Sequence, residues 1–467
     1  MSGVESAVLD SVKYLRGVRP IDPAELVEYV SEPVDTDTIR SIVRAHALDL
    51  ELIEREDGMF EPAPTEPLSH APVAIDRLPE RYCAFVHSSL EEHLGRDWAR
   101  GQSGEQLRRR VRQLKRRYLE GGSLTYDAMD ALAYLVYHSP RTYTAMRYTL
   151  AELTARSLLV PPLRILDVGA GTGGQLAAVA DAVGTETLVS YDAVEPSPLG
   201  ALCESVTTDY VGCNVHVSLH REPIEAVEFD GQYDVILLGN VLSELRDPHE
   251  IAAETFELVG QTGSWVALAP ADPRTSTQLF AIERSLVPPA TAYAPMLRLW
   301  SGREPHDTAW SFVEHPPIEP PSFQRALQAP APEGERDQYT TRSIRYAYTI
   351  LRRDDTRRYT VQGDPDRYRP LGDIEAAIGN RVDCISVKLS ADLSEGDGNP
   401  LIRLGDGSQQ VDCFGVCVRQ TMLNEALIEA PYGAIVSIQQ GLVLWNDDEA
   451  AINLVIDDET IVDQLAP

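Results

Sequence analysis

The sequence predicts an α/β protein in which a parallel β-sheet, covered by helices on both faces, follows a helical region and precedes a small β-barrel. Short apolar runs alternate with helix-length segments in the middle of the chain, which is typical of such a sheet. A glycine-rich loop follows the first of these runs, and the pattern changes to closely spaced strands near the end. A chain of 467 residues is long enough for several domains. We place them at residues 1–65, 73–160, 161–355 and 380–463.

The first segment, residues 1–65, predicts three short helices followed by a β-hairpin, which is the order of elements in a winged helix. Asp22 supplies a side-chain cap for the second helix, and Asp35 or Asp37 supplies one for the third. A nucleic-acid role is as open as a role in protein contact or packing, because the expected third helix has few basic residues: Arg40, Arg44 and His46.

The second segment, residues 73–160, predicts helices and contains a strongly basic stretch. The stretch from Arg96 to Arg117 contains nine basic and two acidic residues, a local net charge of +7. Arginine pairs bidentately with phosphate oxygens, so this basic stretch favours contact with RNA. A solvated helix face paired to acidic neighbours is the alternative. The candidate RNA-binding residues are Arg108, Arg109, Arg112, Lys115 and Arg116.

The chain as a whole is acidic, with 72 acidic against 41 basic residues and a net charge of −31. Such a surface repels itself unless salt screens it, so the composition resembles that of proteins from salt-loving microorganisms. There is no run of 18 apolar residues, and residues 1–20 are too charged for a signal peptide, so we expect a cytoplasmic protein with no membrane partner. The six cysteines are scattered without metal-site spacing, which predicts reduced thiols and no metal site.

The glycine-rich loop, residues 167–174, lies between the first apolar run of the central domain and a helix. Glycines there let the backbone turn sharply and let a ligand approach without a Cβ in the way. Glu195 ends the second run, where a carboxylate accepts both hydroxyls of a ribose, as NAD and S-adenosylmethionine both require. Asp167 discriminates between the two, because a carboxylate before the first glycine would repel the pyrophosphate of a dinucleotide. We therefore predict that the loop binds S-adenosylmethionine.

The end of the fourth apolar run, residues 233–245, is where a methyl acceptor would lie, beyond the carboxyl end of the sheet. Methyl transfer is an in-line displacement that depends mainly on positioning, and a base is needed only when the acceptor holds a proton. Asn240 and Glu244 are the candidate catalytic residues, although a helix cap or packing role for Glu244 is equally open. The candidate cofactor-binding residues are Asp167, Gly169, Ala170, Gly171, Gly173, Glu195 and Asn240.

Five stretches of the chain together resemble the methyltransferase-like family of mitochondrial small-ribosomal-subunit assembly factors and their prokaryotic relatives. The most specific are Pro-x-Thr-Tyr at residues 140–143 and Leu-Ser-Glu-Leu at 242–245. The resemblance spans about residues 81–354 and implies a class I (Rossmann-like) methyltransferase core. The stretches are 133–146, 150–153, 165–173, 241–245 and 346–353.

The same resemblance implies that the protein binds S-adenosylmethionine and acts on, or accompanies, small-subunit ribosomal RNA. Many relatives have cysteines suited to an iron–sulfur cluster near the fifth and sixth strands, whereas residues 269–273 and 309–312 contain none, so we expect no cluster. Three functions follow: a methyltransferase of small-subunit ribosomal RNA, an assembly factor that binds the cofactor without turnover, and a small-molecule methyltransferase. The oligomeric state is not predicted.

The last segment, residues 380–463, predicts five strands with one short helix late in the order, like a small OB-type barrel. Such barrels often bind single-stranded nucleic acids through aromatic and basic side chains. From Asn380 onward the chain holds 15 acidic and 4 basic residues, so a scaffold or protein-contact role is at least as well supported.

Overall fold

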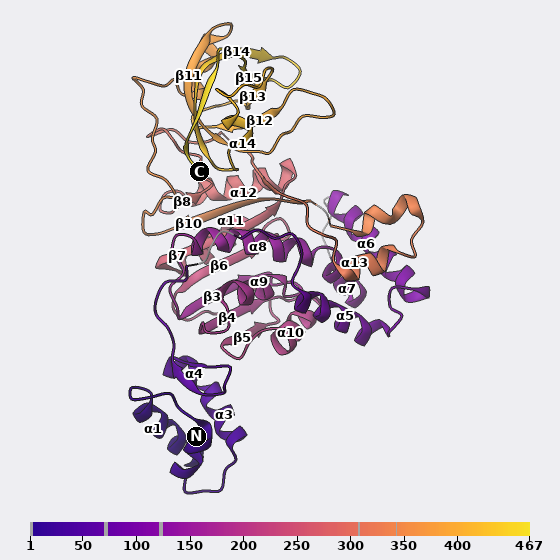
Figure 1. Ribbon diagram of the computed structural model, residues 1–467, viewed down its shortest axis with the longest axis vertical. Helices are drawn as coiled ribbons and strands as arrows, with labels where there is room; N and C mark the ends of the chain where they lie inside the picture. Colours follow the sequence, from indigo (N-terminus) through magenta and orange to yellow (C-terminus); the bar gives the residue numbers. More distant parts are fainter. Residues whose placement is uncertain (1–2, 70–72, 121–124, 307–308, 342) are drawn as a thin grey trace. The chain divides into compact units, whose positions relative to one another are not determined.

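The computed structural model describes residues 3–69, 73–120, 125–306, 309–341 and 343–467 (Figure 1). The chain forms two compact units, and each unit contains parts that are distant in the sequence. One comprises Met1–Gly239 with Pro317–Arg342, and the other comprises Asn240–Pro316 with Ser343–Pro467. None of the helices in the described ranges is long and apolar enough to span a membrane.

The chain begins with helices that pack around an apolar core and end in a short hairpin, as expected for a winged helix. Asp22 caps the second helix, and Asp35, rather than Asp37, caps the third by accepting a hydrogen bond from the Thr38 amide at 2.8 Å. An isolated antiparallel β-bridge joins Ile21 to Phe60 in the hairpin. The elements are α1 (Gly3–Leu15), α2 (Pro23–Leu26), α3 (Thr36–Ala45), α4 (Ala47–Leu50), β1 (Leu52–Glu54) and β2 (Phe60–Pro62).

The helical region that follows is confirmed and belongs to the same unit. Its third helix begins with a capping box, in which the side chains of Asp127 and Asp130 each accept from the other's backbone amide. Asp130 is 2 % exposed and also pairs with Arg110 and Arg117, so it ties neighbouring helices together. The helices are α5 (Glu80–Leu94), α6 (Gly101–Glu120), α7 (Ala128–Tyr137) and α8 (Ser139–Thr154).

The parallel sheet of the first unit has the strand order β5-β4-β3-β6, and helices connect β3 to β4 and β4 to β5 (Figure 1). The order reverses beside β3, so the carboxyl ends of β3 and β6 form the switch point at which such sheets bind ligands. The glycine-rich loop lies there. The elements are β3 (Leu163–Val168), α9 (Gly174–Val183), β4 (Val189–Val194), α10 (Gly200–Asp209), β5 (Val215–His220) and β6 (Tyr233–Gly239); α13 (Ser322–Gln328) also belongs to this unit.

The second unit begins with strands and helices of the same α/β type. The late antiparallel strand expected near residue 345 is present, and it pairs with three other strands of this unit. The elements are α11 (Pro248–Glu257), β7 (Val259–Pro270), α12 (Pro273–Leu286), β8 (Thr291–Ala294), β9 (Val313–His315) and β10 (Ile344–Arg352).

The C-terminal part of the second unit is the OB-like barrel. Five strands close into a ring in the order β11-β12-β13-β15-β14, because β14 also pairs with β11. A sixth strand, β16, pairs with β14 and was not expected from the sequence. The elements are β11 (Arg381–Lys388), β12 (Leu401–Gly405), β13 (Cys413–Cys417), α14 (Ala426–Glu429), β14 (Ile435–Asn446), β15 (Ala451–Ile456) and β16 (Ile461–Ala466).

A strap within the second unit, residues 297–312, is bound to the strand β12 and to the turn that follows it. Residues 307–308 lie outside the described ranges. The Trp300 indole donates to the buried carboxylate of Asp406 at 2.7 Å, and the Arg403 guanidinium donates to the Trp310 carbonyl at 2.8 Å. Arg403 also stacks on the Trp310 ring, 4.3 Å from its centroid. OB barrels bind oligonucleotides on the face of their second and third strands, and here the strap contacts that face.

Candidate cofactor site

The glycine-rich loop has the left-handed backbone that its sequence predicts. Gly169, Gly171 and Gly173 have φ angles of 74°, 57° and 80°. A Cβ on Gly173 would lie 2.8 Å from Val206, so this glycine is required for close packing against α10. A Cβ on Gly171 would meet no atom closer than 3.9 Å, which leaves room for a ligand beside the loop.

That room is bounded by Tyr134 from α7 and Leu199 from the start of α10, because both lie 3.9 Å from a Cβ built on Gly171. The amides of Gly169 and Ala170 donate to the Val194 carbonyl, at 2.9 and 3.1 Å, and fix the loop to the end of β4. The loop is therefore held on one side and open on the other.

Glu195 lies at the end of β4 and reaches the same loop. One carboxylate oxygen accepts from the Gly171 amide and the other from the Ser197 amide, each at 2.9 Å. Its side chain is confined by these bonds, and the residue is 8 % exposed. A carboxylate fixed at this position can accept from two neighbouring hydroxyls, so it fits a ribose.

Asp167 lies behind the loop, is fully buried and is bound by neighbouring side chains. Its oxygens accept from the Gln175 amide at 2.8 Å and from the Tyr191 hydroxyl at 2.6 Å. Burial raises the pKa of Asp167 to about 7; the Tyr191 hydrogen bond opposes this shift and the nearby charge of Glu195 adds to it. Asp167 therefore orients Gln175 and Tyr191.

Gln175 presents a second acceptor in this region. Its amide nitrogen faces the Asp167 carboxylate, which only accepts hydrogen bonds when ionised, so its Oε1 must face the other way. That oxygen is buried and has no hydrogen-bond partner within the described ranges. A buried acceptor without a donor is costly, and the ammonium group of a methionine-type ligand would supply one. The residues present thus fit S-adenosylmethionine.

The segment that carries the family resemblance before the glycine loop packs directly on it. Ser139, at the start of α8, lies 3.1 Å from the Thr172 hydroxyl, and a Cβ on Gly174 would lie 2.6 Å from the Ser139 oxygen. The Tyr134 ring packs against the His138 ring in a tilted arrangement, with 5.0 Å between ring centroids. The sequence alone assigned no role to Tyr134, Ser139 or Gln175, although the 133–146 stretch contains the first two.

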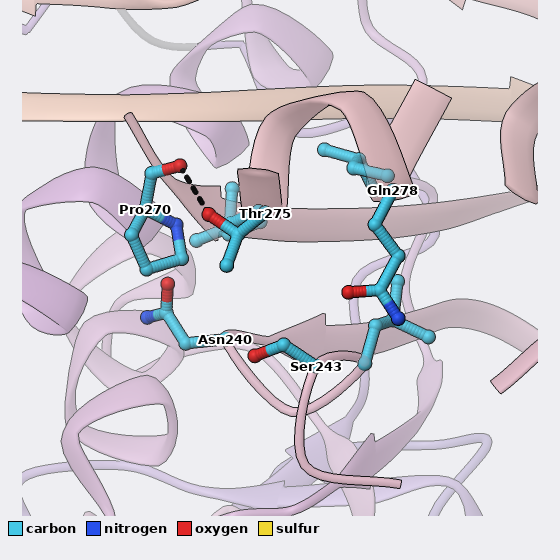
Figure 2. A pocket seen from close by; sticks show the side chains of 9 residues that line it. Asn240, Ser243, Pro270, Thr275 and Gln278 are labelled. Carbon is cyan, nitrogen blue, oxygen red and sulfur yellow. Dashed lines mark hydrogen bonds between the residues drawn. The ribbon is translucent and has the colours of Figure 1, made fainter. Parts of the chain in front are cut away.

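The candidate acceptor residues follow β6 and belong to the second unit. Asn240 has a left-handed backbone, with φ of 63°, and its amide donates to the Leu268 carbonyl at 2.9 Å. Figure 2 shows Asn240 and Ser243 on one side of a small cavity and Pro270 and Thr275 on the other. The cavity has a volume of about 10 Å³, enough for about one water molecule. Glu244 lies in an exposed turn.

The candidate RNA-binding residues on α6 lie in different environments. Arg108 is 5 % exposed and donates to the carbonyls of Ala99 and Leu327, at 3.0 and 3.1 Å. Arg112 pairs with Glu335, and Lys115 donates to the Gln338 carbonyl. Arg109 and Arg116 are exposed. Most of the charge that the sequence places on this helix is therefore bound to acidic or carbonyl oxygens of the same unit.

No group of three or more histidine, cysteine, aspartate or glutamate side chains is arranged to hold a metal ion in the described part of the chain. All six cysteines are free thiols. Burial raises the pKa of Cys203 and Cys413 above their ordinary value, so these two thiols stay protonated.

Comparisons with known proteins agree with the central fold. Residues 143–317 match the family model of a methyltransferase domain, and residues 5–56 and 372–465 match the N-terminal and C-terminal domains of a domain of unknown function, DUF8157. No curated protein sequence matches the chain.

Solved structures of methyltransferases are among the similar proteins. A putative O-methyltransferase from Nostoc punctiforme is 15% identical, with 57% of this chain and 74% of that chain covered and a TM-score of 0.26. A putative methyltransferase from Thermoplasma acidophilum is also 15% identical, with 44% and 71% covered and a TM-score of 0.27. Scores this low do not support an inference of substrate. The family model and the strand order establish that residues 143–317 form a methyltransferase domain of class I type.

Proposed function

We propose that this protein is an S-adenosylmethionine-dependent methyltransferase that acts on small-subunit ribosomal RNA. The observation that supports cofactor use best is the contact between Glu195 and the Gly171 amide at the switch point of the parallel sheet. It joins an acceptor for ribose hydroxyls to a loop with open space beside it. The ribosomal acceptor is inferred from the family resemblance, whose segment 133–146 packs on this loop.

Each residue of the cofactor site has a defined task in this proposal. Glu195 accepts from the ribose hydroxyls, and Gly171 leaves the space in which the ligand lies. Gln175 Oε1, held by Asp167, accepts from the ligand's ammonium group. S-adenosylmethionine bound there would supply a methyl group on a sulfonium, for transfer to an aligned acceptor atom with the sulfur leaving as a thioether. Asn240 and Glu244 are our candidates for orienting that acceptor and for removing its proton.

A second candidate function is a cofactor-binding assembly factor without turnover. Two observations favour it: the cavity beside Asn240 holds only about one water molecule, and Glu244 is exposed, where a carboxylate is solvated. Both observations concern the residues proposed to hold the methyl acceptor, and neither concerns the cofactor site. The two candidates therefore differ only in methyl transfer.

The test is transfer of tritium from labelled S-adenosylmethionine to small ribosomal subunits isolated from a strain that lacks the gene, in about molar potassium chloride because of the net charge of −31. The unmodified protein (the parent) should transfer label to the RNA. Glu195→Gln should lower the affinity for S-adenosylmethionine by roughly 10- to 100-fold, since a hydrogen bond to a charged group is worth about 1.5–3 kcal/mol. Glu204→Gln, in an exposed acid of α10, is the matched control and should behave as the parent.

The outcomes separate the candidates. Label in the RNA that is lost with Glu195→Gln supports the enzyme. Binding of cofactor and of the ribosomal particle without label supports the assembly factor. Cofactor binding with no affinity for the particle contradicts both and leaves a small-molecule methyltransferase.

A further inference from the structure

A row of aromatic rings at the junction of α7 and α8 leads away from the open space beside Gly171. The Tyr134 ring, which bounds that space, packs against the His138 ring with 5.0 Å between centroids. The His138 ring in turn meets the Tyr137 ring edge to face, with 5.1 Å between centroids. Tyr134 and His138 are partly exposed, whereas Tyr137 is buried. The row therefore extends from the cofactor space to the surroundings of Tyr137.

Two cations lie against the Tyr137 ring at the far end of this row. The Lys115 ammonium, from α6, is 4.1 Å from the ring centroid, and the Arg141 guanidinium, from α8, is 4.7 Å from it. Lys115 donates to the Gln338 carbonyl, and Arg141 donates through Nη2 to the Tyr137 hydroxyl at 2.9 Å. Neither cation pairs with a carboxylate of the described residues, so both charges are uncompensated.

The surroundings leave these two charges available to an anion. Glu335, on the segment that Lys115 contacts, is already bound by Arg112 at 3.1 Å. Arg141 Nη1 has no hydrogen-bond partner among the described residues and, unlike Nε, is not buried. The pKa of His138 is lowered to about 3, first by burial and then by the positive charges of Arg141 and Lys115. The positive potential of the two cations therefore reaches the row itself.

The row and its cations together fit a ligand that joins a planar group to an anion. A nucleotide has this form, because its base lies one sugar away from a phosphate. Enzymes that modify a base take it out of the stack and hold it against aromatic side chains, while cations bind the backbone. Arg96 and Arg100 are exposed without an ion pair in the described part of the chain as well, but they lie outside this row.

We infer that Lys115 and Arg141 bind the phosphate backbone of the RNA acceptor, and that the neighbouring base packs on Tyr134 and His138 beside the cofactor space. Phosphate oxygens accept from the Lys115 ammonium and from Arg141 Nη1, and such bonds are strong because they are charge-assisted. This inference rests on the proposed function, which makes RNA the acceptor. It selects one residue of the basic stretch, Lys115, and adds Arg141, which lies outside that stretch.

The test is ultraviolet crosslinking of a single-stranded RNA that contains 4-thiouridine and a fluorescein label to the full-length protein, without cofactor. The RNA has about 30 nucleotides, more than the roughly 4–16 that one single-strand site covers. Mass spectrometry identifies the crosslinked peptide, and fluorescence anisotropy gives the affinity over a series of potassium chloride concentrations.

Three variants accompany the parent. K115Q/R141Q removes both charges of the inferred site. R96Q/R100Q is the matched control, because it removes the same charge from exposed arginines. K115R/R141K keeps both charges while it changes the packing on Tyr137. Melting temperatures show whether any variant has lost its fold.

We expect the parent's crosslinks at Tyr134 or His138. K115Q/R141Q should bind the RNA roughly 10- to 100-fold more weakly, because hydrogen bonds to a charged group are lost. It should also lower the slope of log affinity against log salt by about 0.7 for each phosphate released. R96Q/R100Q and K115R/R141K should each stay within about 3-fold of the parent.

The inference is overturned if the parent does not bind the RNA, if its crosslinks fall only outside residues 133–146, or if folded K115Q/R141Q binds as the parent does. Should K115Q/R141Q fail to fold, the parent's crosslinks decide alone. Methyl transfer is measured separately. Crosslinks at Tyr134 or His138 without transfer contradict the enzyme and support this inference, whereas transfer to RNA with crosslinks only elsewhere supports the enzyme and contradicts this inference.

Discussion

Gly171 and Gly173 share a left-handed backbone, but only Gly171 faces open space, and this difference predicts how two alanine substitutions separate stability from cofactor binding. A left-handed alanine costs about 1–2 kcal/mol. For a unit of this size that lowers the melting temperature by roughly 2–8 °C. Gly173→Ala adds a Cβ 2.8 Å from Val206, and such overpacking costs about 1–3 kcal/mol more.

Gly173→Ala should lose more stability, whereas Gly171→Ala should lose more cofactor binding. The methyl of Gly171→Ala would lie 3.9 Å from both Tyr134 and Leu199, so it fills the gap between them. At about 100 times its dissociation constant, S-adenosylmethionine stabilises the parent by about 2.7 kcal/mol, or roughly 5–11 °C. Gly171→Ala should fold and lose this shift. Gly184→Ala is the matched control, because Gly184 has φ of 78° and nothing within 4 Å of its Cβ, at the other end of α9.

The assay is thermal unfolding of the parent and the three variants with and without S-adenosylmethionine. Gly184→Ala should show the strain penalty and the full cofactor shift, whereas Gly171→Ala should show the penalty alone. If Gly171→Ala keeps the full shift, the open space beside Gly171 is not where the cofactor binds, and the assignment of the site is wrong.

Three further predictions concern buried charges. Burial raises the pKa of Asp167 to about 7, so between about pH 4 and 7 the folded chain binds one proton more than the unfolded chain and loses stability as the pH rises. Asp167→Asn lacks this loss, so in urea unfolding its free energy of unfolding should gain on that of the unmodified protein by up to about 1.4 kcal/mol per pH unit. Parallel curves of unfolding free energy against pH would contradict this. Trp300→Phe leaves the buried Asp406 without its indole donor and should lower the free energy of unfolding by about 1–3 kcal/mol, whereas an unchanged value would show that the strap adds no stability. Glu54→Gln removes the charge partner of the half-exposed Arg44 and Arg40 and should cost about 1 kcal/mol, against no change for the exposed Glu56→Gln.

The cofactor loop was predictable because its demands are local. Glycines at 169, 171 and 173 must adopt left-handed backbone, and an acid at the end of the next strand must face the loop, since both follow from neighbouring strands of a parallel sheet. The buried acceptor of Gln175 was not predictable, because it depends on the orientation that Asp167 imposes. The strap over the barrel was missed for a related reason: Trp300 meets Asp406 across 106 residues of chain, and no periodicity reports such a contact.

The basic stretch on α6 shows why net charge in a sequence is a weak guide to a binding surface. Arg112 and Lys115 meet Glu335 and the Gln338 carbonyl, more than 200 residues away in sequence, so a local net charge of +7 leaves few free cations. The expected third helix of the winged helix behaves alike, because Arg40 and Arg44 are both bound by Glu54. In an acidic chain most cationic side chains lie close to a carboxylate and pair with it.

The same rule applies in reverse to exposed arginines that form no ion pair. The three elements that fold analogy assigns to nucleic acid are the third helix of the winged helix, the basic stretch and the OB face, and their cations are mostly bound internally. An arginine that stays unpaired among so many acids keeps a solvated charge that an anionic ligand can still use, whereas a paired one must first lose its partner. In the described ranges, exposed arginines without an ion pair lie both in the basic stretch, at Arg96, Arg100 and Arg109, and between β10 and the barrel, at Arg357, Arg367 and Arg369. The cost in broken ion pairs therefore does not by itself select one surface for an anionic ligand.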